Sequence, residues 1–194
     1  MAKAFWLRLK LIVGLLLVMT LVNVFNTALD GQLNQFGIIP RSVKSWFHIL
    51  TAPFIHGSTG HLMNNLVGLS IFGVLCLIRS SRFFLGSSLF IIVVGGVLVW
   101  LFGRNASHIG ASGWVFGLWS LSIAIGWFDR RFMNIVVALL VLFLYGGMIY
   151  GVLPTDPRVS FEAHLFGAIA GVACAFVYIA FSKAGRNKNN KVVA

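Results

Sequence analysis

The stretch GASGWVFGLWSLSIAIGWF, residues 110–128, passes from a polar loop into an uncharged apolar run. A run of this length and composition is typical of a helix that spans a membrane. Gly113 and Gly117 form a G-x-x-x-G pair, and this spacing lets two membrane helices bring their backbones close together. Ser112 lies where the loop becomes the run. The stretch therefore predicts a membrane helix that packs closely against a second helix and begins with a hydroxyl group.

The rest of the chain has the same character. It contains 194 residues, of which 59% are hydrophobic and 10% are charged, and its mean hydropathy is +0.94. Soluble domains carry about 25% charged residues, so this composition excludes an ordinary soluble protein. Six apolar runs are long enough to span a bilayer: residues 9–29, 61–79, 83–103, 112–128, 132–153 and 163–182. The sequence predicts an all-α polytopic membrane protein with a single membrane domain, residues 1–194, that ends in a basic cytoplasmic tail, residues 183–194.

The net charge of +11 follows the loops between these runs. When the N-terminus is placed on the inner side, the outer segments contain Arg41, Lys44, Arg104 and Arg158, and every other Lys and Arg lies on the inner side. This asymmetry is the positive-inside pattern, so it predicts cytoplasmic termini. We expect an integral protein of a bacterial inner membrane. Binding to nucleic acid is not expected, because the basic tail lacks interleaved aromatic residues.

The first run follows Lys3, Arg8 and Lys10, an arrangement that also begins secretory signal peptides. Its apolar character continues to Leu29, which is longer than a signal peptide requires, and the small-residue cleavage pattern is missing. The first run is therefore predicted to be a retained membrane helix.

Polar side chains gather at the starts of three runs. In the predicted topology the second, fourth and sixth runs all begin on the outer side, and their first turns carry His61, Asn65, Ser112 and His164. Each residue alone has an ordinary explanation as a helix cap, an interhelical hydrogen bond or a structural histidine. Polar groups inside a membrane are costly, however, and these share one depth with free N–H groups and the positive ends of helix dipoles. Together they predict a functional site near the outer surface.

The chemistry that suits these residue types is acyl transfer. Ser112 is the predicted nucleophile, and His164 is the predicted base that takes its proton and later returns it to the leaving amine. His61 and Asn65 are four residues apart and share a helix face. With the backbone N–H of Ser112 they offer three donors to an oxyanion, in a reaction that needs no cofactor and no metal ion.

A carboxylate that would complete a catalytic triad is missing. The chain contains four acidic residues, none suitably placed: Asp30, Asp129, Asp156 and Glu162. We therefore predict a Ser–His dyad. Phe116, one turn after Ser112, is expected to stack on the imidazole of His164 and fix its orientation in place of an acid. Ordinary core or lipid packing explains Phe116 equally well.

Close approach of the fourth and sixth runs is needed for such a dyad. Gly113 and Gly117 lie on the fourth run, and Gly167 and Gly171 lie on the sixth. The second pair follows His164 by three and seven residues, so it shares a helix face with the histidine. We expect the paired glycines to bring the base to the nucleophile, and Gly167→Val to separate them.

Three motifs, in this order, resemble those of rhomboid intramembrane serine proteases: H-x-x-x-x-H-x-x-x-N at residues 56–65, GASG at 110–113 and AHLFG at 163–167. The resemblance implies a minimal six-helix rhomboid-like bundle and the hydrolysis of peptide bonds in or near the transmembrane helices of membrane-protein substrates. Two departures are present. Trp46-Phe47-His48 stands where the first outer loop of relatives often has Trp-Arg, and Phe116 stands where many relatives have tyrosine.

The same resemblance assigns a role to each motif residue. Ser112 is implied to be the nucleophile and His164 the general base. The implied oxyanion-hole donors are His61, Asn65 and the backbone N–H of Ser112. Gly110 is implied to shape the pocket, and His56 to brace the first outer loop.

Substrates of such an enzyme are membrane helices that arrive laterally from lipid, so the expected partners are transmembrane proteins and membrane lipids, and an oligomer is not required. The resemblance implies that the outer loop before the sixth run caps the site and that the fifth run takes part in substrate access. Gly146, Gly147 and Gly151 would make the fifth run pliable, although close packing explains them equally well. His108, in the loop before Ser112, is expected to be solvated.

Two other functions are compatible with parts of the sequence. A haem-binding membrane cytochrome would use two of the histidines at the outer level as axial ligands, but it gives no reason for the GASG motif or for Asn65. A non-catalytic rhomboid-like protein that binds membrane helices would require the loss of Ser112 or His164, and both are present. The motifs of metalloproteases and aspartyl intramembrane proteases are missing.

Overall fold

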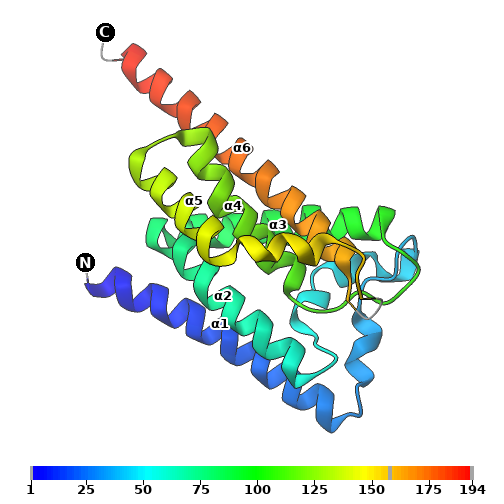
Figure 1. Ribbon diagram of the computed structural model, residues 1–194. Coiled ribbons are helices and arrows are strands. Elements are labelled where there is room, and N and C mark those ends of the chain that lie inside the picture. Colours follow the sequence, from blue (N-terminus) through cyan, green and yellow to red (C-terminus); the bar gives the residue numbers. More distant parts are fainter. Residues whose placement is uncertain (1, 157–158, 193–194) are drawn as a thin grey trace.

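The computed structural model describes residues 2–156 and 159–192, which form a bundle of helices (Figure 1). The α-helices are α1 (Ala2–Ala28), α2 (Thr59–Arg79), α3 (Ser81–Phe102), α4 (Ser112–Asp129), α5 (Phe132–Tyr145) and α6 (Phe161–Val192). Short 3₁₀ helices lie between them: η1 (Gln32–Phe36), η2 (Val43–Ile49), η3 (Ala52–Phe54) and η4 (Gly146–Val152). Among the described residues the only extended pairing is an antiparallel bridge between Ile38 and His108. The predicted all-α membrane fold is confirmed.

Helix α4 is the centre of the bundle, and α2, α3, α5 and α6 pack around it (Figure 1). Within the described ranges, five helical segments are long and apolar enough to cross a membrane: Lys3–Ala28, Thr59–Arg79, Ser81–Phe102, Phe132–Val152 and Phe161–Ser182. Helix α4, whose 18 residues are rich in Ser, Gly and Trp, is not among them. Because most of its side chains are buried by the other helices, α4 faces protein rather than lipid. The fourth predicted run, residues 112–128, is therefore a helix, but its apolar character alone does not mark it as a span.

Three predicted runs have different bounds in the structure, and the first of them, predicted at 9–29, is a helix from Ala2. The run predicted at 132–153 is divided, because α5 ends at Tyr145 and the chain continues as η4 from Gly146. Glycine has a low helix propensity, so two consecutive glycines after Tyr145 favour this change of helix type. The last helix continues to Val192, through most of the predicted polar tail. The side chains of the tail, residues 183–194, and those of Pro157 and Arg158 lie outside the described part.

The predicted first outer loop, between α1 and α2, is folded against the C-terminal end of α3. The side chain of Ile49, at the end of η2, occupies the space that a Cβ atom on Gly96 would fill. Ser45 of this loop is buried and donates from its hydroxyl to the carbonyl of Ile39 at 2.7 Å. The Ile38–His108 bridge then joins this loop to the segment that leads into α4. The first loop thus supports the start of the central helix.

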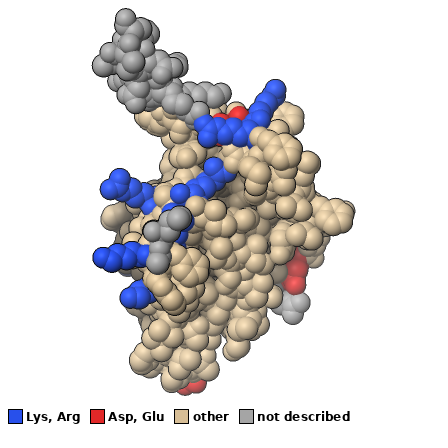
Figure 2. Space-filling view, turned by 90° about the vertical axis from the view of Figure 1, so that its left-hand side faces the viewer, with Lys and Arg blue, Asp and Glu red and all other residues tan. Residues whose placement is uncertain are grey.

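One end of the bundle carries many of the basic residues. The start of α1, the α2–α3 connection and the α4–α5 connection all lie at the left of Figure 1, and Figure 2 shows this end with several Lys and Arg side chains and few acidic ones. Arg79 donates to the Asn134 amide oxygen, and Asn134 donates to Asp129 at 2.7 Å. Arg131 lies 3.4 Å from the same carboxylate. The basic connections are therefore bound to one another at the surface.

Candidate active site

The first turns of α2, α4 and α6 border one cavity of about 850 Å³. It is lined by five of the side chains singled out in the sequence: His61, Asn65, Ser112, Phe116 and His164. The predicted convergence of polar groups from three helix starts is therefore observed. The chemistry of the cavity depends on which atoms of these side chains are hydrogen-bonded within the protein and which are available to a ligand.

Glycines bring α4 and α6 into backbone contact. A Cβ atom on Gly167 would overlap the carbonyl oxygen of Gly113 and lie 2.9 Å from its Cα, and one on Gly171 would overlap the carbonyl oxygen of Gly117. One turn further along, Ser120 of α4 donates from its hydroxyl to the carbonyl of Ala168 at 2.7 Å. These contacts leave no room for a side chain at either α6 position, so the predicted close approach of the two helices is present.

His164, in the first turn of α6, is held by a main-chain group. Its Nδ1 lies 2.8 Å from the carbonyl oxygen of Gly151. A carbonyl oxygen can only accept, so Nδ1 carries the proton and donates. The other ring nitrogen, Nε2, therefore keeps its lone pair. This is the tautomer that a general base needs. The carbonyl of Gly151 accepts from the histidine in the way that the aspartate of a Ser-His-Asp triad does.

Phe116 lies flat against the imidazole of His164. The two ring centroids are 4.1 Å apart and the ring planes differ by 6°, so the stacking expected from the sequence is observed. A Cβ atom on Gly151 would lie 2.6 Å from Phe116 Cζ and 3.4 Å from His164 Nδ1, whereas one on Gly146 or Gly147 would meet nothing within 4 Å. Close packing therefore explains Gly151, and the change to a 3₁₀ helix explains the other two glycines.

Ser112 is the first residue of α4 and is half-buried at the cavity wall. The first N–H groups of a helix have no partner within the helix, so the Ser112 N–H is among those free to bind a ligand. In the described part of the chain no hydrogen bond joins Ser112 to His164. Such bonds are commonly long in substrate-free enzymes and shorten when substrate binds. The two side chains share the cavity in this state.

Asn65 and His61 both lie beside Gly110, in the loop before Ser112, and border the cavity. Asn65 is 4% exposed, and its Nδ2 is a buried donor without a hydrogen-bond partner among the described residues. Leaving a buried donor unpaired costs about 1–3 kcal/mol, so its retention marks a place for a ligand acceptor. Gly110 has φ +105°, and a Cβ atom there would lie 2.6 Å from His61 Nε2 and 3.5 Å from Asn65 Nδ2. Only glycine lets this loop approach both donors.

His56 supports the loop that precedes Ser112. It is 1% exposed, its carbonyl accepts from the Asn26 amide at 3.2 Å, and its Nε2 accepts from the backbone N–H of Ala111 at 3.4 Å. Burial, and to a smaller extent the neighbouring His61, lower the pKa of His56 to about 4. The ring is therefore neutral near pH 7, as an acceptor must be. The residue implied to brace the first outer loop also holds the start of α4.

The protonation of His56 predicts a loss of stability in acid. In the unfolded chain His56 takes up a proton near its ordinary pKa of 6.5, whereas the folded protein excludes that proton until about 4. The contribution of His56 to the free energy of unfolding is thus complete above its unfolded pKa, and it declines as the pH falls toward its folded pKa. We expect this residue to lower the free energy of unfolding by about 2 kcal/mol between about pH 7 and about pH 5.

The His56 contribution is measured as a difference between two proteins unfolded in mixed micelles at both pH values. His56→Gln keeps an acceptor but cannot titrate, so it should lose less stability on acidification than the wild type. Equal losses in the two proteins would show that folding does not lower the pKa of His56.

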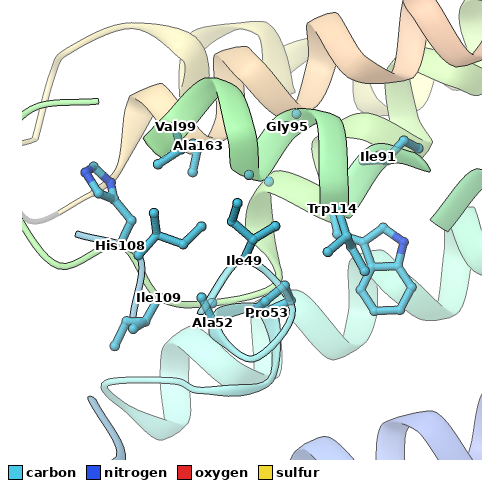
Figure 3. A pocket seen from close by; sticks show the side chains of 16 residues that line it. Ile49, Ala52, Pro53, Ile91, Gly95, Val99, His108, Ile109, Trp114 and Ala163 are labelled. Carbon is cyan, nitrogen blue, oxygen red and sulfur yellow. The ribbon is translucent and has the colours of Figure 1, made fainter. Parts of the chain in front are cut away.

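His108 differs from its expected solvated state. It is 3% exposed, and both ring nitrogens are within hydrogen-bond distance of described groups, Nδ1 at 2.6 Å from Ser160 Oγ and Nε2 at 3.0 Å from the Arg104 carbonyl. The prediction was wrong because the sequence does not show that the first outer loop covers this segment. His108 and Ile109 border a small apolar cavity behind the loop, together with Ile49 and Trp114 (Figure 3).

Two functional groups escaped the sequence-based reasoning. The carbonyl of Gly151 could not be identified from the sequence, since every residue has a carbonyl. The glycine itself was the available sign that the chain packs closely there. The pairing of Arg104 with Glu162 was also missed, although both residues lie in outer segments next to Ser112 and His164. The opposite charges of Arg104 and Glu162, in the segments that precede Ser112 and His164, were the available signal.

Known proteins resemble this chain over most of its length. The family described as the rhomboid domain matches residues 43–181. An uncharacterized protein of Mycobacterium tuberculosis is 33% identical over 175 residues, which cover 86% of this chain and 73% of that protein. One from Mycobacterium leprae is 32% identical over 185 residues, covering 88% and 73%. The chloroplastic rhomboid-like protein 11 of Arabidopsis thaliana is 33% identical over 162 residues, covering 76% and 58%.

The family match includes all the residues that border the site: the His56–Asn65 segment, the loop before Ser112 and the start of α6. It also spans the helices α2 to α6 that build the bundle around α4. The chain belongs to the rhomboid family.

Proposed function

We propose that this protein is an intramembrane serine endopeptidase that hydrolyses peptide bonds in or near the transmembrane helices of other proteins. The observation that carries the proposal is the state of His164. Its Nδ1–H is bound to the Gly151 carbonyl at 2.8 Å, so its Nε2 is a base on the wall of the cavity that Ser112 also lines. Family membership supports the same reaction class.

In the proposed reaction His164 Nε2 takes the proton of the Ser112 hydroxyl as Oγ attacks the scissile carbonyl carbon. The carbonyl oxygen becomes an oxyanion and accepts hydrogen bonds from His61, Asn65 and the Ser112 N–H, each worth about 3–4 kcal/mol at the transition state. His164 then gives the proton to the leaving amine, and an acyl-enzyme remains. Water, activated by the same nitrogen, hydrolyses the ester and restores Ser112.

The imidazolium that forms in each step needs stabilisation. In the proposed enzyme it comes from the Gly151 carbonyl on one side and from the face of Phe116, which lies parallel to the ring at 4.1 Å. A carbonyl dipole and a π face attract a cation less strongly than a carboxylate does, but both are fixed before the reaction begins. This arrangement suits a dyad.

Substrate access is proposed between α2 and α5. The cavity is bordered there by Val67 and Ile71 of α2 and by Tyr145 of α5 and Met148 of η4. Only 11% of the residues in the apolar window of Phe132–Val152 are buried, so most of its side chains are open to a helix that arrives from lipid. A substrate helix must expose its carbonyls, so segments weakened by Gly or Pro near their outer end should be cleaved preferentially.

The proposed orientation places the basic end of the bundle in the cytoplasm and the cavity toward the outer side. The Arg residues at the α2–α3 and α4–α5 connections support it (Figure 2). The proposed location is a bacterial inner membrane, with lipid as the medium from which transmembrane substrates arrive. A single chain contains every group that the mechanism uses, so an oligomer is not required.

The haem-binding alternative finds little support in the geometry. His108 uses both ring nitrogens within the chain, and His56 and His164 each use one. The rings of His56 and His61 are 5.1 Å apart in an edge-to-face arrangement, which is not that of two axial ligands on opposite sides of a porphyrin.

The proposed function is tested with the wild-type protein in liposomes and a single-pass reporter that has glycines near its outer end. We expect cleavage within that end, complete loss of cleavage after treatment with a serine-reactive fluorophosphonate, and no effect of a chelator. A matched reporter with leucines in place of the glycines should be cleaved more slowly. Cleavage that survives full fluorophosphonate labelling, or no cleavage of either reporter, would contradict the proposal.

A further inference from the structure

His108 is hydrogen-bonded to the cap of the helix that carries His164. Its Nε2 lies 3.0 Å from the Arg104 carbonyl, which can only accept, so Nε2 carries the proton. Its Nδ1 is therefore the acceptor for the Ser160 hydroxyl, 2.6 Å away. Ser160 in turn accepts from the backbone N–H of Ala163 at 3.2 Å, which is the contact of a helix N-cap. A buried imidazole thus fixes the group that begins α6.

Arg104 makes a second connection to the same turn. Its Nε lies 3.6 Å from Glu162 Oε1, its backbone N–H donates to that oxygen at 3.3 Å, and its Nη2 donates to the Val159 carbonyl at 2.7 Å. The guanidinium also lies over the ring of Phe161, 5.7 Å from its centroid. The Glu162 side chain is 7% exposed and the Arg104 side chain 36%, so the carboxylate of this ion pair is shielded from water and the guanidinium is partly open to it.

Both connections start in the segment that leads into Ser112 and end in the turn that contains His164. His108 precedes Ser112 by four residues, and Glu162 precedes His164 by two. The glycine contacts hold α4 and α6 together on the membrane side of the dyad, beginning at Gly113 and Gly167. The polar contacts hold the same two segments on the outer side. The dyad therefore lies between two sets of interactions that join its two halves.

We propose that His108, Ser160, Arg104 and Glu162 form an outer clamp that sets the separation of Ser112 and His164. The residues of the outer clamp are positioning residues, since they act through the loop and the helix turn rather than on substrate. Their role in catalysis rests on the proposed function. A displacement of about 1 Å in a catalytic group can lower a rate by about 100-fold, so loss of the outer clamp should affect the chemical step more than substrate binding.

The kinetic test compares His108→Ala with His108→Asn, which keeps an acceptor that can reach the Ser160 hydroxyl. We expect His108→Ala to lower kcat by about 10- to 100-fold with little change in KM, and His108→Asn to recover most of the loss. Glu162→Gln, which keeps the shape of the side chain and removes its charge, should lower kcat less. Thr51→Val is the matched control, because it removes an outer-loop hydrogen bond, to the Phe36 carbonyl, that does not involve α6.

A distance measurement tests the outer clamp without relying on activity. Spin labels are placed on Asn105→Cys and Val159→Cys, with Cys76 and Cys174 replaced by alanine, and the distance distribution is measured by pulsed electron paramagnetic resonance in liposomes. Adding His108→Ala should broaden the distribution and lengthen its mean, whereas adding Thr51→Val should not. Unfolding midpoints show that the variants are folded.

The two measurements separate the possible failures. The outer-clamp proposal is wrong if the distance distribution of His108→Ala matches that of the parent. It is also wrong if kcat is unchanged, with or without a rise in KM. If the wild type cleaves no substrate but His108→Ala still broadens the distribution, the clamp holds the two segments and the proposed function fails instead.

Discussion

Alanine in place of Ser112 is expected to lower the rate of substrate cleavage by about 10⁴-fold or more, because the acyl-enzyme cannot form without the hydroxyl. His164→Ala should lower the rate by a similar factor, since Oγ is not activated without Nε2. The double variant should be no slower than either single variant, because the two groups act as a unit. Initial rates on the glycine-containing reporter in liposomes provide the measurement.

Ser122→Ala is the matched control for this loss. Ser122 lies on the same helix, and its hydroxyl donates to the carbonyl of Leu118 at 2.8 Å within α4 itself. Its removal should leave cleavage unchanged. If Ser112→Ala retained more than a small fraction of the wild-type rate, another residue would have to be the nucleophile.

Gly167→Ala is expected both to destabilise the protein and to abolish cleavage. A Cβ atom at this position would overlap the carbonyl oxygen of Gly113, and both partners are helix backbone, so neither can move by a change of rotamer. Overpacking of this kind costs about 1–3 kcal/mol and is relieved only when α4 and α6 separate. Separation moves His164 away from Ser112. The larger Gly167→Val should have a greater effect on both properties.

Gly86→Ala is the control for the change at Gly167. Gly86 also lies inside a helix, α3, but a Cβ atom there would meet nothing within 4 Å. We expect Gly86→Ala to keep the wild-type activity and to unfold at the same or a slightly higher denaturant concentration, since alanine favours helix over glycine. If the Gly167→Ala protein had normal activity and stability, the α4–α6 contact would be looser than described.

The parts of the fold that follow from local composition could be predicted from the sequence. Apolar runs report on contact with lipid, and the second and third runs gave helices, α2 and α3, close to the expected bounds. Helix α4 is recognised less well by hydropathy because its surroundings are protein, which accepts Ser, Gly and Trp. The break between Tyr145 and Gly146 was also not predicted, although the glycines that cause it were noted as a source of pliability.

The site was predictable where it depends on side chains at fixed helical positions. His61, Asn65, Ser112 and His164 occupy first turns whose depth follows from topology, so their meeting at one cavity could be expected. Groups that reach the site through long-range contacts could not be predicted. The Gly151 carbonyl that holds His164 is a main-chain atom, and the burial of His108 depends on how the first outer loop folds over it. Sequence patterns describe neither.

The assignment of Ser112 as a nucleophile activated by His164 is tested most directly by mapping a covalent adduct. Wild-type protein and His164→Ala are treated with a fluorophosphonate probe in liposomes, digested and analysed by tandem mass spectrometry. The wild type should carry one adduct, on Ser112, and the His164→Ala protein should carry almost none, because its serine is not activated. An adduct on another residue, or equal labelling of Ser112 in both proteins, would contradict the assignment.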